Sequence, residues 1–131
     1  MKKKIKKFII IGTPFFLIIH FLGWFKFYYK LQFYDEIVHF LAGASVFLVF
    51  YWMLKNKFKN NLKATCLSLI GLLVISFLWE SLEVLLDNIL GNYFVIEPLQ
   101  LGFLDTITDV IANFAGAVFI IIFLIFKSDF K

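Results

Sequence analysis

Long apolar stretches separated by short polar segments make up most of the chain, and the charged residues gather near the ends of these stretches. A membrane-spanning helix needs about 17–25 mostly apolar residues, whereas a strand of a membrane barrel needs only about 10. Four stretches have the length of a helix, namely Phe8–Phe25, Ile37–Leu54, Ala64–Leu90 and Phe103–Phe126. The pattern therefore predicts an all-α fold, in which residues 1–131 form a single domain of four transmembrane helices. The connections are short, so we expect neighbouring helices to run antiparallel.

Composition agrees with a membrane protein and excludes several other classes. Of the 131 residues, 62% are hydrophobic and 17% are charged, whereas a soluble domain has about 45–50% apolar and about 25% charged residues. A soluble enzyme, a disordered chain and a disulfide scaffold are therefore excluded. All 13 basic residues are lysines, which argues against nucleic acid as a partner because arginine forks dominate base recognition. The single cysteine, Cys66, has no partner in the chain for a disulfide.

The lysines are distributed unequally between the two ends of the predicted spans. If the N-terminus is cytoplasmic, 11 of the 13 lysines lie on the cytoplasmic side, and only Lys26 and Lys30 lie outside. The positive-inside rule then predicts that both termini are cytoplasmic, in a multi-pass protein of the plasma or inner membrane. The basic start resembles a signal peptide, but bulky residues follow its apolar stretch where a cleavage site needs small ones. We therefore expect the first span to be retained.

The acidic residues lie on the side opposite to the lysines. Of the nine, only Asp129 falls in the cytoplasmic tail of the predicted topology. At a rise of about 1.5 Å per residue, His39, Glu80 and Asp109 lie about 24–27 Å above the nearest cytoplasmic lysines, near the outer edge of a core about 30 Å thick. His20 of the first span lies slightly deeper. Three or four helices thus carry ionisable groups at similar depth.

Within each span these polar residues are spaced three or four positions apart, so they share one face of their helix. Charged groups facing lipid are costly, and we expect these faces to turn toward each other or toward a wet cavity. Small residues around Gly43 and Gly116 would allow the helices to approach closely. The predicted polar site, which would open to the extracytoplasmic side, consists of Asp35, His39, Glu80, Glu83, Asp105, Asp109 and Asn113.

Simpler explanations compete with a common site. Solvation at a helix end accounts for Asp35, Glu36, Asp87 and Glu97, and capping of a helix accounts for Asp105. Asn113 is explained by a hydrogen bond between helices, and His20 by ordinary packing. The deeper residues His39, Glu80 and Asp109 are less well explained by solvation, and they are the candidate metal ligands.

Three segments together resemble a known family: Tyr34–Gly43 (YDEIVHFLAG), Trp79–Glu83 (WESLE) and Asp105–Gly116 (DTITDVIANFAG). In order and spacing they are similar to the VanZ-like membrane proteins and the related YjdF-type inner-membrane proteins. The resemblance covers spans two to four and implies a small multi-pass envelope protein, without implying one particular reaction. VanZ-like proteins often have Lys at the position of Glu36 and Gln at that of Glu83, so the departures favour the YjdF-type group.

Three classes of function fit this pattern. The first is a binding or structural membrane protein, whose partner besides the bilayer is a lipid head group or another membrane protein. The second is a metal-dependent enzyme of the cell envelope that acts on a lipid-linked or phosphorylated head group, with a divalent metal ion as cofactor, because carboxylates and imidazole bind such ions. The third is a transporter or an ion-coupled accessory protein. We rank them in this order, since the motifs of known metalloproteases, serine hydrolases and nucleotide-binding loops are absent from the sequence.

Overall fold

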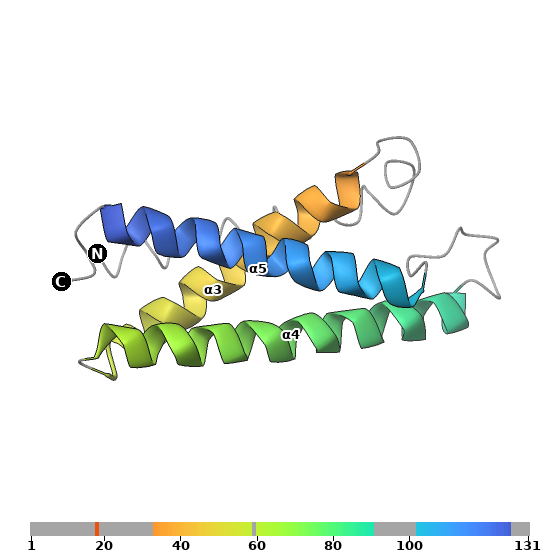
Figure 1. The fold of residues 1–131 in the computed structure, drawn as a ribbon. Helices are drawn as coiled ribbons and strands as arrows, with labels where there is room; N and C mark the ends of the chain where they lie inside the picture. Colours follow the sequence, from red (N-terminus) through yellow and green to blue (C-terminus); the bar gives the residue numbers. More distant parts are fainter. Residues whose placement is uncertain (1–17, 19–32, 59, 91–101, 127–131) are drawn as a thin grey trace.

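The computed structural model describes residues 18, 33–58, 60–90 and 102–126. The described chain contains three long helices, α3 (Tyr34–Lys55), α4 (Asn61–Leu90) and α5 (Phe103–Phe126) (Figure 1). All three are long and apolar enough to cross a membrane. The first predicted span, 8–25, lies outside the described residues apart from Ile18.

The end of α3 and the start of α4 have side-chain hydrogen bonds from asparagines to the backbone, whereas the start of α3 has no side-chain cap. Helices α3 and α4 each begin three residues earlier than the apolar pattern predicts, whereas α5 has the predicted bounds. At the start of α4 the side-chain oxygen of Asn60 accepts a hydrogen bond from the backbone N–H of Lys63 at 3.1 Å, and such a cap satisfies one of the open donors of a first turn. At the end of α3 the Asn56 amide donates to the carbonyl of Trp52 at 2.9 Å.

Helices that follow one another in the sequence run antiparallel, as the short connections predicted, so α3 and α5 run in the same direction. In Figure 1, the end of α3, the start of α4 and the end of α5 lie at the same end of the bundle, and α3 crosses α5 obliquely. Helix α3 is the central element, because it packs most extensively against α5 and also contacts α4, whereas α4 and α5 contact each other least. Residues of α3 are therefore the ones that connect the other two helices.

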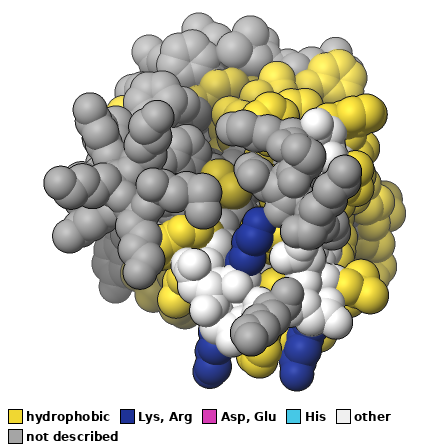
Figure 2. Space-filling model, turned by 90° about the vertical axis from the view of Figure 1, so that its left-hand side faces the viewer, with side chains coloured by type: hydrophobic (Ala, Val, Ile, Leu, Met, Phe, Trp, Pro, Cys, Tyr) yellow, Lys and Arg dark blue, Asp and Glu magenta, His cyan; other side chains and the backbone are white. Residues whose placement is uncertain are grey.

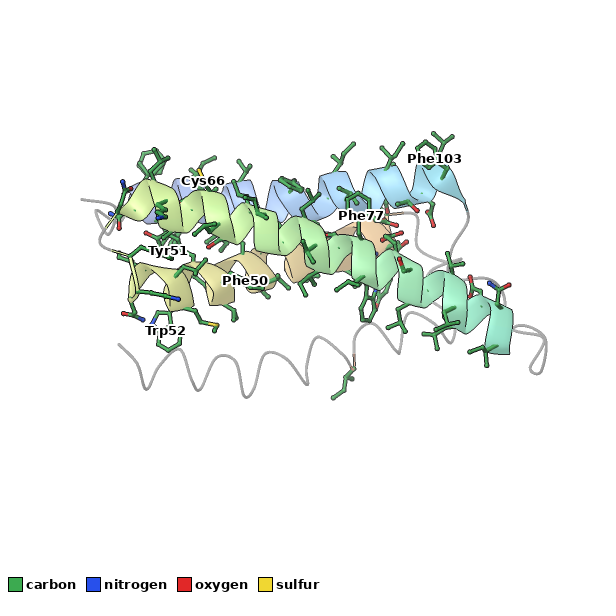
Figure 3. The ribbon with its side chains drawn as sticks, turned by 90° about the horizontal axis from the view of Figure 1, so that it is seen from below. Phe50, Tyr51, Trp52, Cys66, Phe77 and Phe103 are labelled. Carbon is green, nitrogen blue, oxygen red and sulfur yellow. The ribbon has the colours of Figure 1, made fainter. Side chains whose placement is uncertain are left out.

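The polarity of the described bundle is that of a membrane protein. Large apolar side chains cover its outer surface, among them Ile70, Val74 and Phe123, whereas carboxylates, serines and a histidine are buried inside. Cys66 is exposed as well, and Figure 3 shows it pointing outward from α4. Apolar residues outside and polar residues inside are what a bilayer requires of a helix bundle.

An apolar core holds the helices together at the end that carries the described lysines. The side chains of Phe47, Tyr51, Leu72 and Leu124 are buried against one another, and the rings of Phe47 and Tyr51 stack with their centroids 5.8 Å apart. Figure 3 shows Tyr51 turned toward α4, whereas its neighbour Trp52 points away. Figure 2 views this end directly and shows lysines, with no acidic side chain visible among the described residues. The polar residues lie in the other half of the bundle.

Candidate functional site

His39 of α3 is the central residue of the buried polar cluster. Its side chain is enclosed between helices, with 2% of the residue exposed. The imidazole Nε2 lies 3.5 Å from Oδ1 of Asp35, one turn earlier on the same helix, and 3.9 Å from Oδ2 of Asp109 on α5. The other ring nitrogen, Nδ1, lies 3.2 Å from the side-chain nitrogen of Asn113, also on α5. One imidazole thus joins α3 to two residues of α5.

Two glycines explain why α3 and α5 can approach so closely here. A Cβ atom built on Gly43 would overlap the backbone carbonyl of Asn113, and one built on Gly116 would overlap the backbone carbonyl of Phe40. Each glycine therefore faces the backbone of the opposite helix immediately beside a polar residue of the cluster. This bears out the expectation that small residues permit a close crossing, and only glycine fits at these two positions.

Helix α4 contributes two carboxylates from the opposite side of His39. Glu80 and Glu83 are both 4% exposed, and Glu83 Oε1 accepts a hydrogen bond from the indole nitrogen of Trp79 at 2.8 Å. Because Trp79 and Glu83 are four residues apart, this bond fixes the carboxylate along the axis of its own helix. Glu83 therefore has a preset orientation toward the interior.

The acidic and imidazole groups form two sets of potential metal ligands that share His39. One set consists of Asp35, His39 and Asp109, and the other of His39, Glu80 and Glu83; within each set the ligand atoms lie within 4.8 Å of one another. Ligand atoms around a bound transition metal lie about 2.0–2.2 Å from the ion, so small side-chain rotations would bring either set into range.

The structure brings together six of the seven residues that the sequence placed in a polar site. Asp35, His39, Glu80, Glu83 and Asp109 belong to the two sets, and Asn113 joins them through its contact with His39. Asp105 is half-buried in the first turn of α5 and belongs to neither set, but it lies close enough to Asp35, Glu83 and Asp109 to interact with them electrostatically. The predicted metal ligands Glu80 and Asp109 each approach His39, but they do so in different sets.

The amide of Asn113 determines what His39 can do. With the amide nitrogen facing Nδ1, that ring nitrogen accepts a hydrogen bond, and Nε2 of a neutral imidazole carries the proton toward Asp35. If the amide turns by half a rotation, its oxygen accepts a hydrogen bond from Nδ1–H, and the lone pair of Nε2 is then available to a metal ion. The two orientations of the Asn113 amide occupy the same volume, so Asn113 can hold the His39 ring in place with the proton on either ring nitrogen.

Charge within the described residues is separated along the bundle. The lysines Lys55, Lys57 and Lys63 lie at or beyond the ends of α3 and α4 that meet at residues 56–60. The carboxylates lie in the opposite half. His39 is the member of the polar cluster that can itself carry a positive charge, so a cation bound there would offset the repulsion between neighbouring carboxylates.

Comparison with known families identifies the group to which this chain belongs. A family model described as "Predicted membrane protein (DUF2238)" matches residues 1–129. The chain is a member of the DUF2238 family. No curated protein and no solved structure matches the chain. Membership in DUF2238 agrees with the expectation of a small integral membrane protein, while the narrower VanZ-like or YjdF-type assignment stays a prediction.

Two residues of this DUF2238 protein belong to the site although the sequence analysis did not select them. Trp79 entered the sequence analysis only as the first residue of the WESLE segment, and its indole donates a hydrogen bond to buried Glu83. Ser76 is 3% exposed and lies beside His39 and Asn113 in the wall of an internal cavity. The signal for Ser76 was its spacing of four residues from Glu80, which puts both on one face of α4.

Proposed function

We propose that this protein holds one divalent metal ion between α3, α4 and α5, at the level of His39 and in the extracytoplasmic half of the membrane. The observation that carries the proposal is that two sets of ligand atoms share one imidazole, with every residue buried except half-buried Asp35 and every set spanning no more than 4.8 Å. Two elements of the proposal come from the sequence: the lysine distribution, which sets the sidedness, and the resemblance to YjdF-type membrane proteins.

The nature of the donors favours particular metals. Imidazole combined with several carboxylates suits Zn²⁺ and Mn²⁺, whereas sites for Ca²⁺ and Mg²⁺ consist of oxygen ligands alone. Because His39 belongs to both sets, an ion bound to this imidazole has carboxylates of α3, α4 and α5 as neighbouring ligands. Asn113 would act as the outer partner that orients the imidazole, as hydrogen-bond acceptors do for most metal-bound histidines.

A second candidate function, a metal-dependent envelope enzyme, is favoured by the cavity beside His39. A bound ion with an open coordination position would polarise a phosphoryl oxygen of a lipid-linked or phosphorylated head group. A proton-coupled transporter is less well supported, because the described lysine-bearing half of the bundle has an apolar core around Phe47 and Leu72, whereas proton relays need ionisable groups along the path.

Metal analysis of the purified protein tests the proposal. The full chain in detergent, dialysed against Zn²⁺ or Mn²⁺, should retain about one ion per chain, and His39→Gln should weaken binding by about tenfold or more. Asp87→Asn is the matched control, since Asp87 is a carboxylate of α4 outside both sets, and it should bind metal as the wild type does. Equal metal contents in His39→Gln, Asp87→Asn and the wild type would refute the site.

A further inference from the structure

A cavity of about 200 Å³ adjoins the candidate metal site. The end of the cavity at the polar cluster contains His39, Asn113 and Trp79, and the part nearer the lysine-bearing half is lined by Val46 and Leu72. Between His39 and Val46 the helix rises by about 10 Å, so the cavity extends toward the membrane centre. It is smaller than the pockets of about 300–1,000 Å³ that enclose a whole small molecule, and it therefore suits one segment of a larger ligand.

Ser76 provides an independent sign that the cavity receives a ligand. Serines inside helices usually donate to the carbonyl four residues earlier, and on α4 both Ser68 and Ser81 do so, at 2.7 Å and 2.8 Å. The hydroxyl of Ser76 is buried and has no hydrogen-bond partner among the described residues. A buried hydroxyl without a partner costs free energy, and this one lies in the cavity wall, where a ligand oxygen can accept its proton.

The order of polarity along the bundle matches a lipid of the outer leaflet. The carboxylate and imidazole groups lie toward the predicted extracytoplasmic side, and the apolar part of the cavity lies below them. A lipid of that leaflet has its phosphate outside, then its ester oxygens, and then its acyl chains toward the membrane centre. The metal site, the Ser76 hydroxyl and the apolar walls follow one another in the same order.

We propose that the cavity binds the upper part of one acyl chain of a phosphate-bearing lipid, with the Ser76 hydroxyl donating to an ester oxygen and the phosphate contacting the metal ion beside His39. This inference rests on the proposed metal site and specifies its ligand. The ion is needed for binding because phosphate and buried carboxylates repel each other without it.

Fluorescence quenching of Trp79 tests this inference, since its indole lines the cavity. The full chain carrying Trp24→Phe and Trp52→Phe retains Trp79 as its single tryptophan. In unbrominated detergent with Zn²⁺, phosphatidic acid with brominated acyl chains should quench Trp79 saturably. Inorganic phosphate should not prevent quenching at equal concentration, and a chelator should abolish it. Metal content is measured on the same samples.

Ser76→Leu fills the cavity and Ser81→Leu is its matched control, because Ser81 is an exposed serine of the same helix. Ser76→Leu should retain the metal and weaken lipid binding by about tenfold or more, since each methylene excluded from an apolar site lowers affinity by about fourfold. Ala42→Leu fills the cavity from the α3 side and should act in the same way if Ser76→Leu does not fold.

The possible results separate the two proposals. A protein that binds metal but whose Trp79 is not quenched saturably refutes the lipid site alone, and another part of the chain then fills the cavity. Quenching that a chelator does not change, or that Ser76→Leu and Ser81→Leu reduce equally, also refutes the lipid site. A protein without metal refutes the proposed function and this inference with it.

Discussion

Replacing Gly43 by alanine tests whether the crossing of α3 and α5 builds the polar site. The new Cβ would overlap the carbonyl of Asn113, so the two helices must move apart by about 1 Å or more to reach van der Waals contact. The contact between Asn113 and His39, now 3.2 Å, would then exceed hydrogen-bonding distance. Overpacking costs about 1–3 kcal/mol, and a lost hydrogen bond between membrane helices costs about 0.6 kcal/mol more.

Gly71→Ala is the control for this substitution, because alanine is the better helix former by about 1 kcal/mol at both positions. At Gly71 the atoms nearest to the new Cβ would belong to the ring of Phe50, at 3.1 Å, and a side chain can yield where a backbone cannot. We expect Gly43→Ala to be less stable than Gly71→Ala by about 2–4 kcal/mol. Reversible unfolding in mixed detergent and denaturant micelles measures the difference. Equal stability of the two variants would refute the proposed role of the crossing.

Three further predictions follow from the described residues. Asn113→Leu should weaken metal binding by about 10–100-fold while Asn113→Asp preserves it, because of these two side chains only the carboxylate can accept a hydrogen bond from the imidazole. Calorimetric titration with Zn²⁺ measures the affinities, and equal losses in both variants would contradict the prediction. Metal affinity should fall as the pH is lowered, because protons compete with the ion for imidazole and carboxylate; an affinity that is constant from pH 8 to pH 5 would exclude these ligands. Phe33→Gly should raise the free energy of unfolding by about 1 kcal/mol, because Phe33 precedes α3 with a left-handed φ of 72° that glycine adopts without strain. The Phe33 side chain is mostly exposed, so little packing is lost. A lower free energy of unfolding than that of the wild type would contradict the prediction.

The sequence predicted much of the fold because the membrane restricts what a helix can be. The length of the apolar stretches alone predicted the bounds of α5, and it predicted the first residues of α3 and α4 to within three positions. The cost of a charge in lipid predicted that His39, Glu80 and Asp109 turn inward, and all three are buried. These results depend on local pattern and on one physical rule, so they require no knowledge of how the helices pack.

The partners of each polar group could not be predicted in the same way. Whether Asp109 pairs with Asp35 or with Glu80 around His39 depends on the tilt and rotation of three helices, which the backbone contacts at Gly43 and Gly116 determine. Ser76 was overlooked because a serine in a helix usually bonds to its own backbone. Trp79 was not selected either, although its spacing of four residues from Glu83 puts both side chains on one face of α4 and permits the bond between them.

The helix crossing and the polar site stabilise each other for a physical reason. Lipid tails are as apolar as leucine, so burial of apolar surface contributes little to helix pairing in a bilayer, and close packing and polar contacts must supply the free energy. Gly43 faces Asn113, and Gly116 faces Phe40 beside His39, so the same backbone contacts set both the packing and the ligand distances. An ion at about 100 times its dissociation constant would add about 2.7 kcal/mol to the folded state, comparable to the cost of disrupting the crossing. The apolar contacts of Phe47 and Tyr51 lie in the other half, so loss of the ion should loosen the half of the bundle that carries the polar cluster while the lysine-bearing half stays packed.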